Sequence, residues 1–77
     1  MAYDVRAYYD GDLRGLADRR ICSTQDDMID TVHELCCFQG NFVKIVNNET
    51  GASLVFDPDT WMECIDYGDV PESIKKL

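Results

Sequence analysis

The sequence lacks a long apolar segment and is poor in basic residues. No apolar run approaches the ~20 residues that a membrane-spanning helix needs, and the first residues hold no apolar stretch of the signal-peptide kind. We therefore expect a soluble, cytoplasmic protein. Seven lysines and arginines stand against fifteen aspartates and glutamates, a formal net charge of −8 over 77 residues. Such a charge repels phosphates and anionic lipids, so we expect no direct contact with nucleic acid or membrane.

The sequence also lacks any motif that specifies catalysis or a cofactor. The single histidine, His33, lies at helical spacing from two cysteines, but the Cys-x-x-Cys and His-x-x-x-His pairs typical of zinc sites are missing. Its acidic neighbours disfavour a thiolate nucleophile, and we expect a solvated surface histidine. We therefore expect no enzyme, metal or cofactor, and reduced cysteines that fill the core: Cys22, Cys36, Cys37 and Cys64. A metal or redox module that uses these cysteines is a weaker alternative.

Alternation of apolar and polar residues predicts a hairpin at the start of the chain. Residues 2–9 alternate as in a strand with one buried face. Asp10-Gly11-Asp12 forms the turn, because Asp-Gly accepts the positive φ of tight hairpins. Residues 13–22 return as a second strand, and their irregular alternation indicates a bulge near Gly15.

The most regular pattern predicts a helix over residues 25–38. Ser23-Thr24 supplies an N-cap, and Gly40 is a natural end. The apolar residues recur at the spacing of one helical stripe: Met28, Ile29, Val32, Leu35 and Cys36.

The second half of the chain repeats the hairpin and helix. Residues 41–47 and 52–56 predict two strands that are apolar on both faces, so we expect both to lie centrally and to be covered. Asp57-Pro58 starts a helix that Gly68 closes, and a strand over residues 61–67 is the alternative.

The predicted order is thus β-β-α-β-β-α, a single α+β domain over residues 1–77. We expect one small antiparallel sheet with helices packed on it. The tail after residue 70 forms one helical turn or stays loose.

The distribution of charge singles out the predicted helix over residues 25–38. Residues 1–22 hold four acids and four arginines, whereas residues 23–77 hold eleven acids and three lysines. Four carboxylates share the outer face of this helix, which destabilises it through repulsion: Asp26, Asp27, Asp30 and Glu34. A row of this kind either keeps the protein soluble or occupies a basic groove that normally holds phosphates.

We take the second interpretation as our hypothesis: the row binds a basic partner protein, and Tyr8 or Tyr9 adds an apolar contact. The arginines of the first hairpin alternate with tyrosines, a pattern that can bind nucleic acid by stacking on its bases. The acids of the same hairpin make cross-strand ion pairs the interpretation that we favour. A small homodimeric regulatory or assembly module is the alternative function.

In size, charge and hairpin–helix build, the chain resembles the small acidic proteins that bacteriophages and mobile elements encode against host defence. These include anti-CRISPR proteins and DNA-mimic antirestriction proteins. The resemblance implies a stoichiometric inhibitor without enzymatic machinery. It further implies a partner with a basic nucleic-acid channel, such as a CRISPR effector complex, in the cytosol of a bacterial host.

Overall fold

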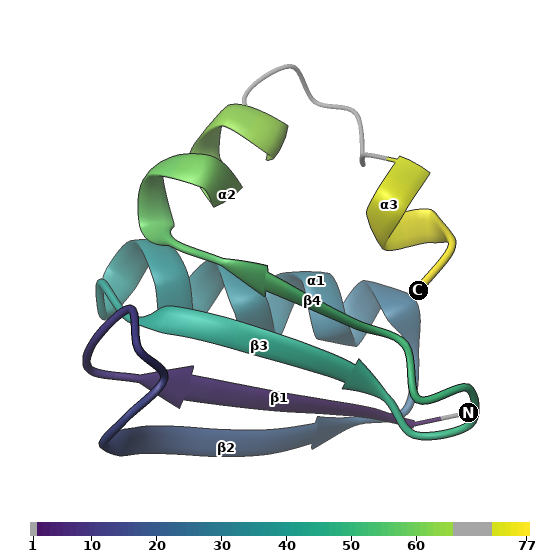
Figure 1. The fold of residues 1–77 in the computed structure, drawn as a ribbon. Coiled ribbons are helices and arrows are strands. Elements are labelled where there is room, and N and C mark those ends of the chain that lie inside the picture. The colour runs from purple at the N-terminus through teal and green to yellow at the C-terminus, as the bar shows by residue number, and fades with distance from the viewer. Residues whose placement is uncertain (1, 66–71) are drawn as a thin grey trace.

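The chain forms two layers, a four-stranded sheet and a layer of helices (Figure 1). The computed structural model describes residues 2–65 and 72–77. In chain order the elements are β1 (Tyr3–Tyr8), β2 (Leu16–Cys22), α1 (Gln25–His33), the π-helical turn η1 (Glu34–Phe38), β3 (Phe42–Asn47), β4 (Ser53–Phe56), α2 (Pro58–Ile65) and α3 (Glu72–Lys75). The predicted α+β fold and the β-β-α-β-β-α order are confirmed, and the tail adds the short helix α3.

The four strands pair antiparallel in the order β2-β1-β3-β4. The two hairpins meet through their first strands, so that Val5 of β1 lies opposite Arg20 of β2 on one side and Ile45 of β3 on the other. β1 and β3 are therefore the interior strands, and β2 and β4 form the edges.

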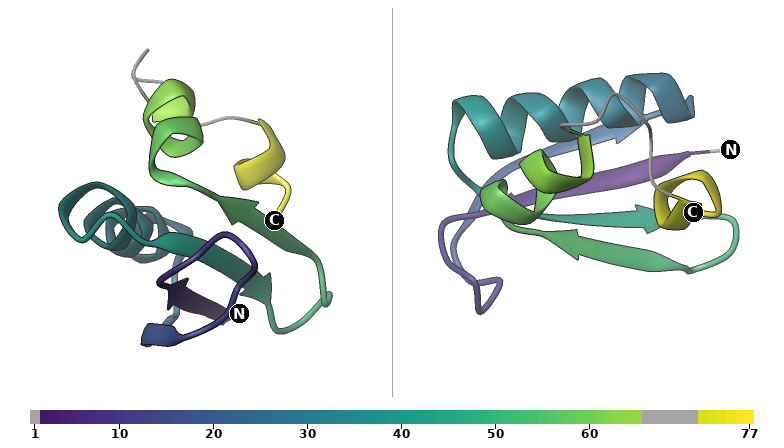
Figure 2. Two further views of the ribbon diagram at one scale, coloured as in Figure 1. Left: turned by 60° about the vertical axis from the view of Figure 1, so that its left-hand side comes forward. Right: turned by 90° about the horizontal axis from the view of Figure 1, so that it is seen from above.

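One face of the sheet packs against the helices. Val5, Val43 and Ile45 are fully buried on this face, and they meet Met28 and Val32 of α1 in one core. Figures 1 and 2 show α1 running along one side of the sheet, with α2 and α3 on the same side near β4. The opposite face of the sheet carries the alternate residues of each strand, and no described helix covers it.

The expectation that residues 41–47 and 52–56 are both central and covered is wrong. β3 is central, but β4 is an edge strand, and Val55 is half exposed on the face without a helix. The sequence misleads here because a valine or phenylalanine at a strand position signals β-propensity as well as burial.

The loop of the first hairpin is longer than predicted, and β2 begins at Leu16 rather than at residue 13. The side chain of Asp10 organises this loop. Its Oδ1 accepts hydrogen bonds from the backbone N–H groups of Asp12 (3.0 Å) and Arg14 (3.2 Å). These bonds add to the backbone hydrogen bond from the N–H of Leu13 to the carbonyl of Asp10 (3.1 Å).

The predicted irregularity of the second strand is a β-bulge, two residues past the expected position. Ala7 lies opposite Asp18, but the next residue, Tyr8, lies opposite Leu16, so that Ala17 is the additional residue. The bulge resets the alternation of β2 and explains why its apolar residues do not keep one phase.

The predicted first helix is confirmed, but its last five residues form a π-helical turn. At its start, the hydroxyl of Thr24 accepts a hydrogen bond from the backbone N–H of Asp27 (3.1 Å), as an N-cap should. At its end, the N–H of Gln39 donates to the carbonyl of Glu34, five residues back (3.3 Å). Gly40 stops the helix with φ +70°, a conformation that glycine adopts without strain.

The helix α2 begins at the predicted cap. Asp57 Oδ1 accepts a hydrogen bond from the backbone N–H of Thr60 at 2.7 Å, and this bond lowers the pKa of Asp57. The strand alternative for residues 61–67 is wrong, because residues 61–65 belong to α2. The predicted end at Gly68 lies outside the described residues.

Polar side chains from distant elements hold the chain around α3. Gln25 Nε2, at the start of α1, donates to the carbonyls of Ile74 (3.1 Å) and Lys75 (3.3 Å). The buried amide of Asn47, at the end of β3, donates to the carbonyl of Leu77. Because the Ile74 side chain is fully buried, the short helix α3 closes one end of the core.

Candidate functional site

The candidate site is the row of carboxylates along the outer side of α1 and the first residue of η1, called here the acidic ridge: Asp26, Asp27, Asp30 and Glu34. All four residues are exposed, while the opposite side of the same helix packs on the sheet. The packing fixes the direction of the helix, so the carboxylates project from a rigid element rather than from a loop. The predicted shared face is therefore present.

Three carboxylates of the ridge carry uncompensated charge. Within residues 2–65 and 72–77, the side chains of Asp26, Asp27 and Asp30 make no ion pair. Asp26 and Asp27 lie in the first turn, where a negative charge interacts favourably with the helix dipole. Asp30 lies beyond that turn and four residues after Asp26, so repulsion between the two disfavours the helix.

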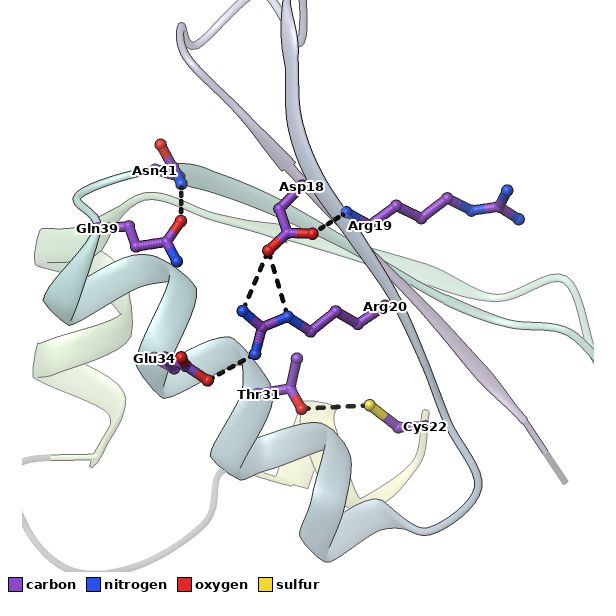
Figure 3. Close-up of polar contacts among 8 residues, drawn as sticks. All are labelled: Asp18, Arg19, Arg20, Cys22, Thr31, Glu34, Gln39 and Asn41. Atoms are coloured by element: carbon purple, nitrogen blue, oxygen red, sulfur yellow. Dashed lines mark hydrogen bonds and ion pairs between the residues drawn. The ribbon is translucent and has the colours of Figure 1, made fainter.

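Glu34 differs from the other three, because it is tied to the sheet (Figure 3). Arg20 reaches from β2 toward the helix, where its Nη1 lies 2.6 Å from Glu34 Oε2 and its Nη2 lies 3.1 Å from Asp18 Oδ2. The hydrogen bond with Glu34 is the main cause of a raised pKa of Arg20. Glu34 thus fixes the end of the ridge on β2, where it shares the single positive charge of Arg20 with Asp18.

The structure does not bring Tyr8 and Tyr9 together with the ridge. Cys22, after which α1 begins, pairs with Tyr3 at one end of β1, whereas Tyr8 is the last residue of that strand. Tyr8 also lies on the face of the sheet that no described helix covers, opposite Phe42 of β3. Tyr9 is 72% exposed at the far end of the strand. Tyr8 therefore lies on the face of the sheet opposite to the helix that carries the ridge.

The expected cross-strand ion pairs of the first hairpin are present in part: Arg19 pairs across the strands with Asp4, whereas Arg6 reaches the same carboxylate from its own strand. Asp4 Oδ2 lies 2.8 Å from Arg19 Nη2 and 3.1 Å from Arg6 Nη2, and Arg19 Nε donates to Asp4 Oδ1 at 3.0 Å. Asp4 itself is 3% exposed. The hydrogen bonds from Arg19 lower its pKa, against the effect of burial. Arg6 and Arg19 lie opposite each other on neighbouring strands, and Asp4 lies two residues before Arg6 on the same face. This cross-strand pattern of two arginines and one acid could have indicated the cluster from the sequence.

The residues considered for a zinc site are not assembled into one. Cys22 and Cys36 are buried in the core, and burial raises the pKa of Cys36 to about 12, which keeps this thiol protonated. Cys37 and Cys64 are half-buried, and all four cysteines are free thiols. In the described part of the chain, no three His, Cys, Asp or Glu side chains are placed to hold a metal ion.

His33 is not the solvated surface histidine that its acidic neighbours suggest. It is half-buried, and its Nδ1 accepts a hydrogen bond from the indole Nε1 of Trp61 at 3.2 Å. Phe38 packs edge-on against the imidazole, with ring centroids 5.9 Å apart. The interaction links α1 to α2, and it depends on a contact between residues 28 positions apart, which local sequence patterns do not reveal.

Residues 2–65 and 72–77 enclose no pocket, and none of their helices is long and apolar enough to cross a membrane. Comparisons with protein-family models, curated proteins and solved structures gave no match. The surface chemistry of the described residues is therefore the basis for assigning a function.

Proposed function

We propose that this protein is a non-enzymatic inhibitor or interaction protein whose acidic ridge binds the basic, nucleic-acid-binding surface of a partner protein. The observation that carries the proposal is the exposure of Asp26, Asp27 and Asp30 on one side of a helix, without an ion pair among the described residues. Counter-charges for these carboxylates come from a partner.

The ridge suits a groove lined with lysine and arginine. A helix is a rigid support, and the four residues from Asp26 to Asp30 rise by about 6 Å along its axis. Carboxylates held in this way accept charge-assisted hydrogen bonds from the same side chains that hold phosphates. Binding of the ridge and binding of nucleic acid are then mutually exclusive.

The resemblance to small acidic inhibitors of host defence supports a more specific version of the proposal. In that version the partner is a CRISPR effector complex in a bacterial cytosol, and the protein blocks its nucleic-acid channel stoichiometrically. The net charge of −8 supports fast, salt-sensitive association with such a basic target.

Charge reversal tests the proposal. The double variant Asp26→Lys/Asp30→Lys changes the net charge from −8 by +4 to −4. Two exposed charge pairs at ~0.5–1 kcal/mol each correspond to a ~5- to 30-fold weaker complex when they are lost. The assay is a pull-down from a lysate of the host with the tagged full chain. A gel-shift measurement then tests whether the captured partner releases its nucleic acid.

The matched control is Asp12→Lys/Glu63→Lys, which makes the same charge change at exposed positions away from the ridge. We expect the control to bind like the wild type and the ridge variant to lose the partner. Binding should also weaken between about 0.1 M and 1 M salt, as the Debye length falls from ~10 to ~3 Å. Equal retention of both variants, or a partner that still binds nucleic acid in the complex, contradicts the proposal.

The exposed apolar residues of the edge strand β2 favour a second candidate, a homodimeric regulatory or assembly module. Leu16 and Ile21 are 54% and 58% exposed at an edge whose backbone groups are open to pairing with another strand. Light scattering at both salt concentrations separates the candidates. A dimer that is insensitive to salt and dissociates in the variant Ile21→Lys supports the second.

A further inference from the structure

Cys37 contacts two further potential metal ligands, an imidazole and a thioether, where the end of α1 and the π-helical turn meet α2. Cys37 Sγ lies 3.6 Å from His33 Nδ1 and 3.1 Å from Met62 Sδ. His33 and Cys37 are half-buried, and Met62 is 43% exposed, so the three atoms lie at the surface. We propose that His33, Cys37 and Met62 form a binding site for a soft monovalent metal ion, copper(I). The site is independent of the acidic ridge.

The identity of the donors selects the metal. A thiolate and a thioether are soft ligands that prefer copper(I), and an imidazole also suits copper. A structural zinc site needs four ligands from cysteine, histidine or carboxylates, and no such set is present among the described residues. Three-coordinate binding by one nitrogen and two sulfurs therefore points to copper(I) rather than to zinc or a hard divalent cation.

A shared metal requires one nitrogen–sulfur separation that is already present and a wider separation of the two sulfurs. With metal–sulfur and metal–imidazole bonds of about 2.3 and 2.0 Å, as for zinc, a trigonal site separates nitrogen and sulfur by about 3.7 Å and the two sulfurs by about 4.0 Å. The Cys37–His33 separation of 3.6 Å already fits. Met62 has to retreat by about 1 Å, which its flexible, half-exposed side chain allows.

The π-helical turn supplies part of this geometry. Cys37 follows His33 by four residues, and the turn that contains Cys37 has five-residue hydrogen bonds such as that from Gln39 to Glu34. π-Helices are rare, and single π-helical turns inside α-helices are frequent at functional sites. The widened turn places Cys36 in the core and leaves Cys37 at the junction with α2.

Metal binding at His33 competes with a hydrogen bond inside the protein. The lone pair of His33 Nδ1 accepts the indole N–H of Trp61, which is fully buried. A metal on Nδ1 displaces this N–H. Burial raises the pKa of the Cys37 thiol, so the metal also displaces a proton, which leaves to solvent as the copper–sulfur bond forms. Since Trp61 is the only tryptophan, its fluorescence reports on the site.

The test is an anaerobic titration of the reduced full chain with copper(I) buffered by bicinchoninate, followed by Trp61 fluorescence. We expect one equivalent to change the emission. Cys37→Ser should weaken binding at least about 100-fold and Met62→Leu about tenfold, losses of about 2.7 and 1.4 kcal/mol in binding free energy. Met62 is half-exposed, so its leucine variant folds. His33→Gln should abolish the change in emission.

Cys64→Ser is the matched control, since it removes another half-buried thiol and should leave the affinity unchanged. The proposal is overturned if Cys37→Ser binds like the wild type, or if Met62→Leu retains full affinity, because an isolated thiol then accounts for binding. Tighter binding of zinc(II) than of copper(I) likewise overturns the assignment of the metal.

Discussion

Replacement of Asp4 by asparagine should destabilise the protein more than its position on an uncovered sheet face suggests. Asp4 is almost fully buried beneath two arginine side chains, which surround its carboxylate. Asparagine keeps the size of the side chain but removes the charge and one acceptor oxygen. Arg6 and Arg19 are then left as two like charges without the carboxylate between them.

The magnitude follows from three hydrogen bonds to one buried carboxylate, at 2.8, 3.0 and 3.1 Å. Breaking a buried charge pair costs about 3–5 kcal/mol, but the arginine side chains are 40% and 52% exposed and recover part of this from water. Asparagine also still accepts one hydrogen bond. We therefore expect Asp4→Asn to lower the free energy of unfolding by about 2 kcal/mol at pH 7, and Tm by ~8–16 °C.

The effect should depend on pH in one direction. The folded state lowers the pKa of Asp4 below its unfolded value of about 3.9, so its contribution to stability is complete above that value. This contribution is lost as the pH falls through the folded pKa, where the protonated wild type resembles the variant. The difference in unfolding free energy between wild type and variant should thus be constant from neutral pH down to about pH 5 and shrink below about pH 4.

Urea unfolding followed by Trp61 fluorescence measures both quantities. Asp12→Asn, at an exposed loop position, is the control and should change stability by less than about 0.5 kcal/mol. An unchanged urea midpoint for Asp4→Asn at pH 7 would refute the reasoning. So would a difference that does not shrink at all below about pH 4, because the unfolded wild type then takes up the proton that the folded state resists.

Three further predictions concern the helices and the thiols. In the native protein, Cys37 and Cys64 should react with iodoacetamide well before Cys22 and Cys36, as peptide mass spectrometry can show. Labelling of all four thiols at one rate would contradict the burial of Cys22 and Cys36 in the core. Asp30→Ala should raise the free energy of unfolding by about 0.5–1 kcal/mol in urea titrations, because it improves helix propensity and removes a repulsion; a loss of stability would mean that Asp30 serves folding. Arg20→Gln should lower the free energy of unfolding by at most about 1 kcal/mol in urea titrations, since its ion pairs are partly exposed. A larger loss of stability would show that these ion pairs link β2 to α1 more strongly than we expect.

The elements that local patterns specify were predictable from the sequence. The helix from Gln25 was anticipated because its cap, Thr24, and its apolar stripe lie within a few turns of each other. The two hairpins were anticipated because alternation and turn residues are also local signals. The bulge at Ala17 was detectable as broken alternation, although its position was not.

The features that depend on distant contacts were not predictable. The position of β4 at the edge follows from the pairing of β1 with β3, which no local pattern specifies. The burial of Asp4 and the engagement of His33 by Trp61 arise from partners 15 and 28 positions away. The shared face of the acidic ridge was predictable from helical periodicity, but the pairing of Glu34 with Arg20 was not.

The arrangement of ion pairs supports our proposal that the acidic ridge binds a partner. The arginines Arg6, Arg19 and Arg20 are engaged with acids of their own sheet or with the end of the ridge. Charges scattered over loops would keep the protein equally soluble without repulsion in a helix. Instead, Asp26 and Asp30 are four residues apart on one helix, where they destabilise it. The arginines of the sheet thus do not neutralise Asp26 and Asp30, although the two acids repel each other. This pattern is what we expect if a partner protein supplies the positive charges that neutralise them.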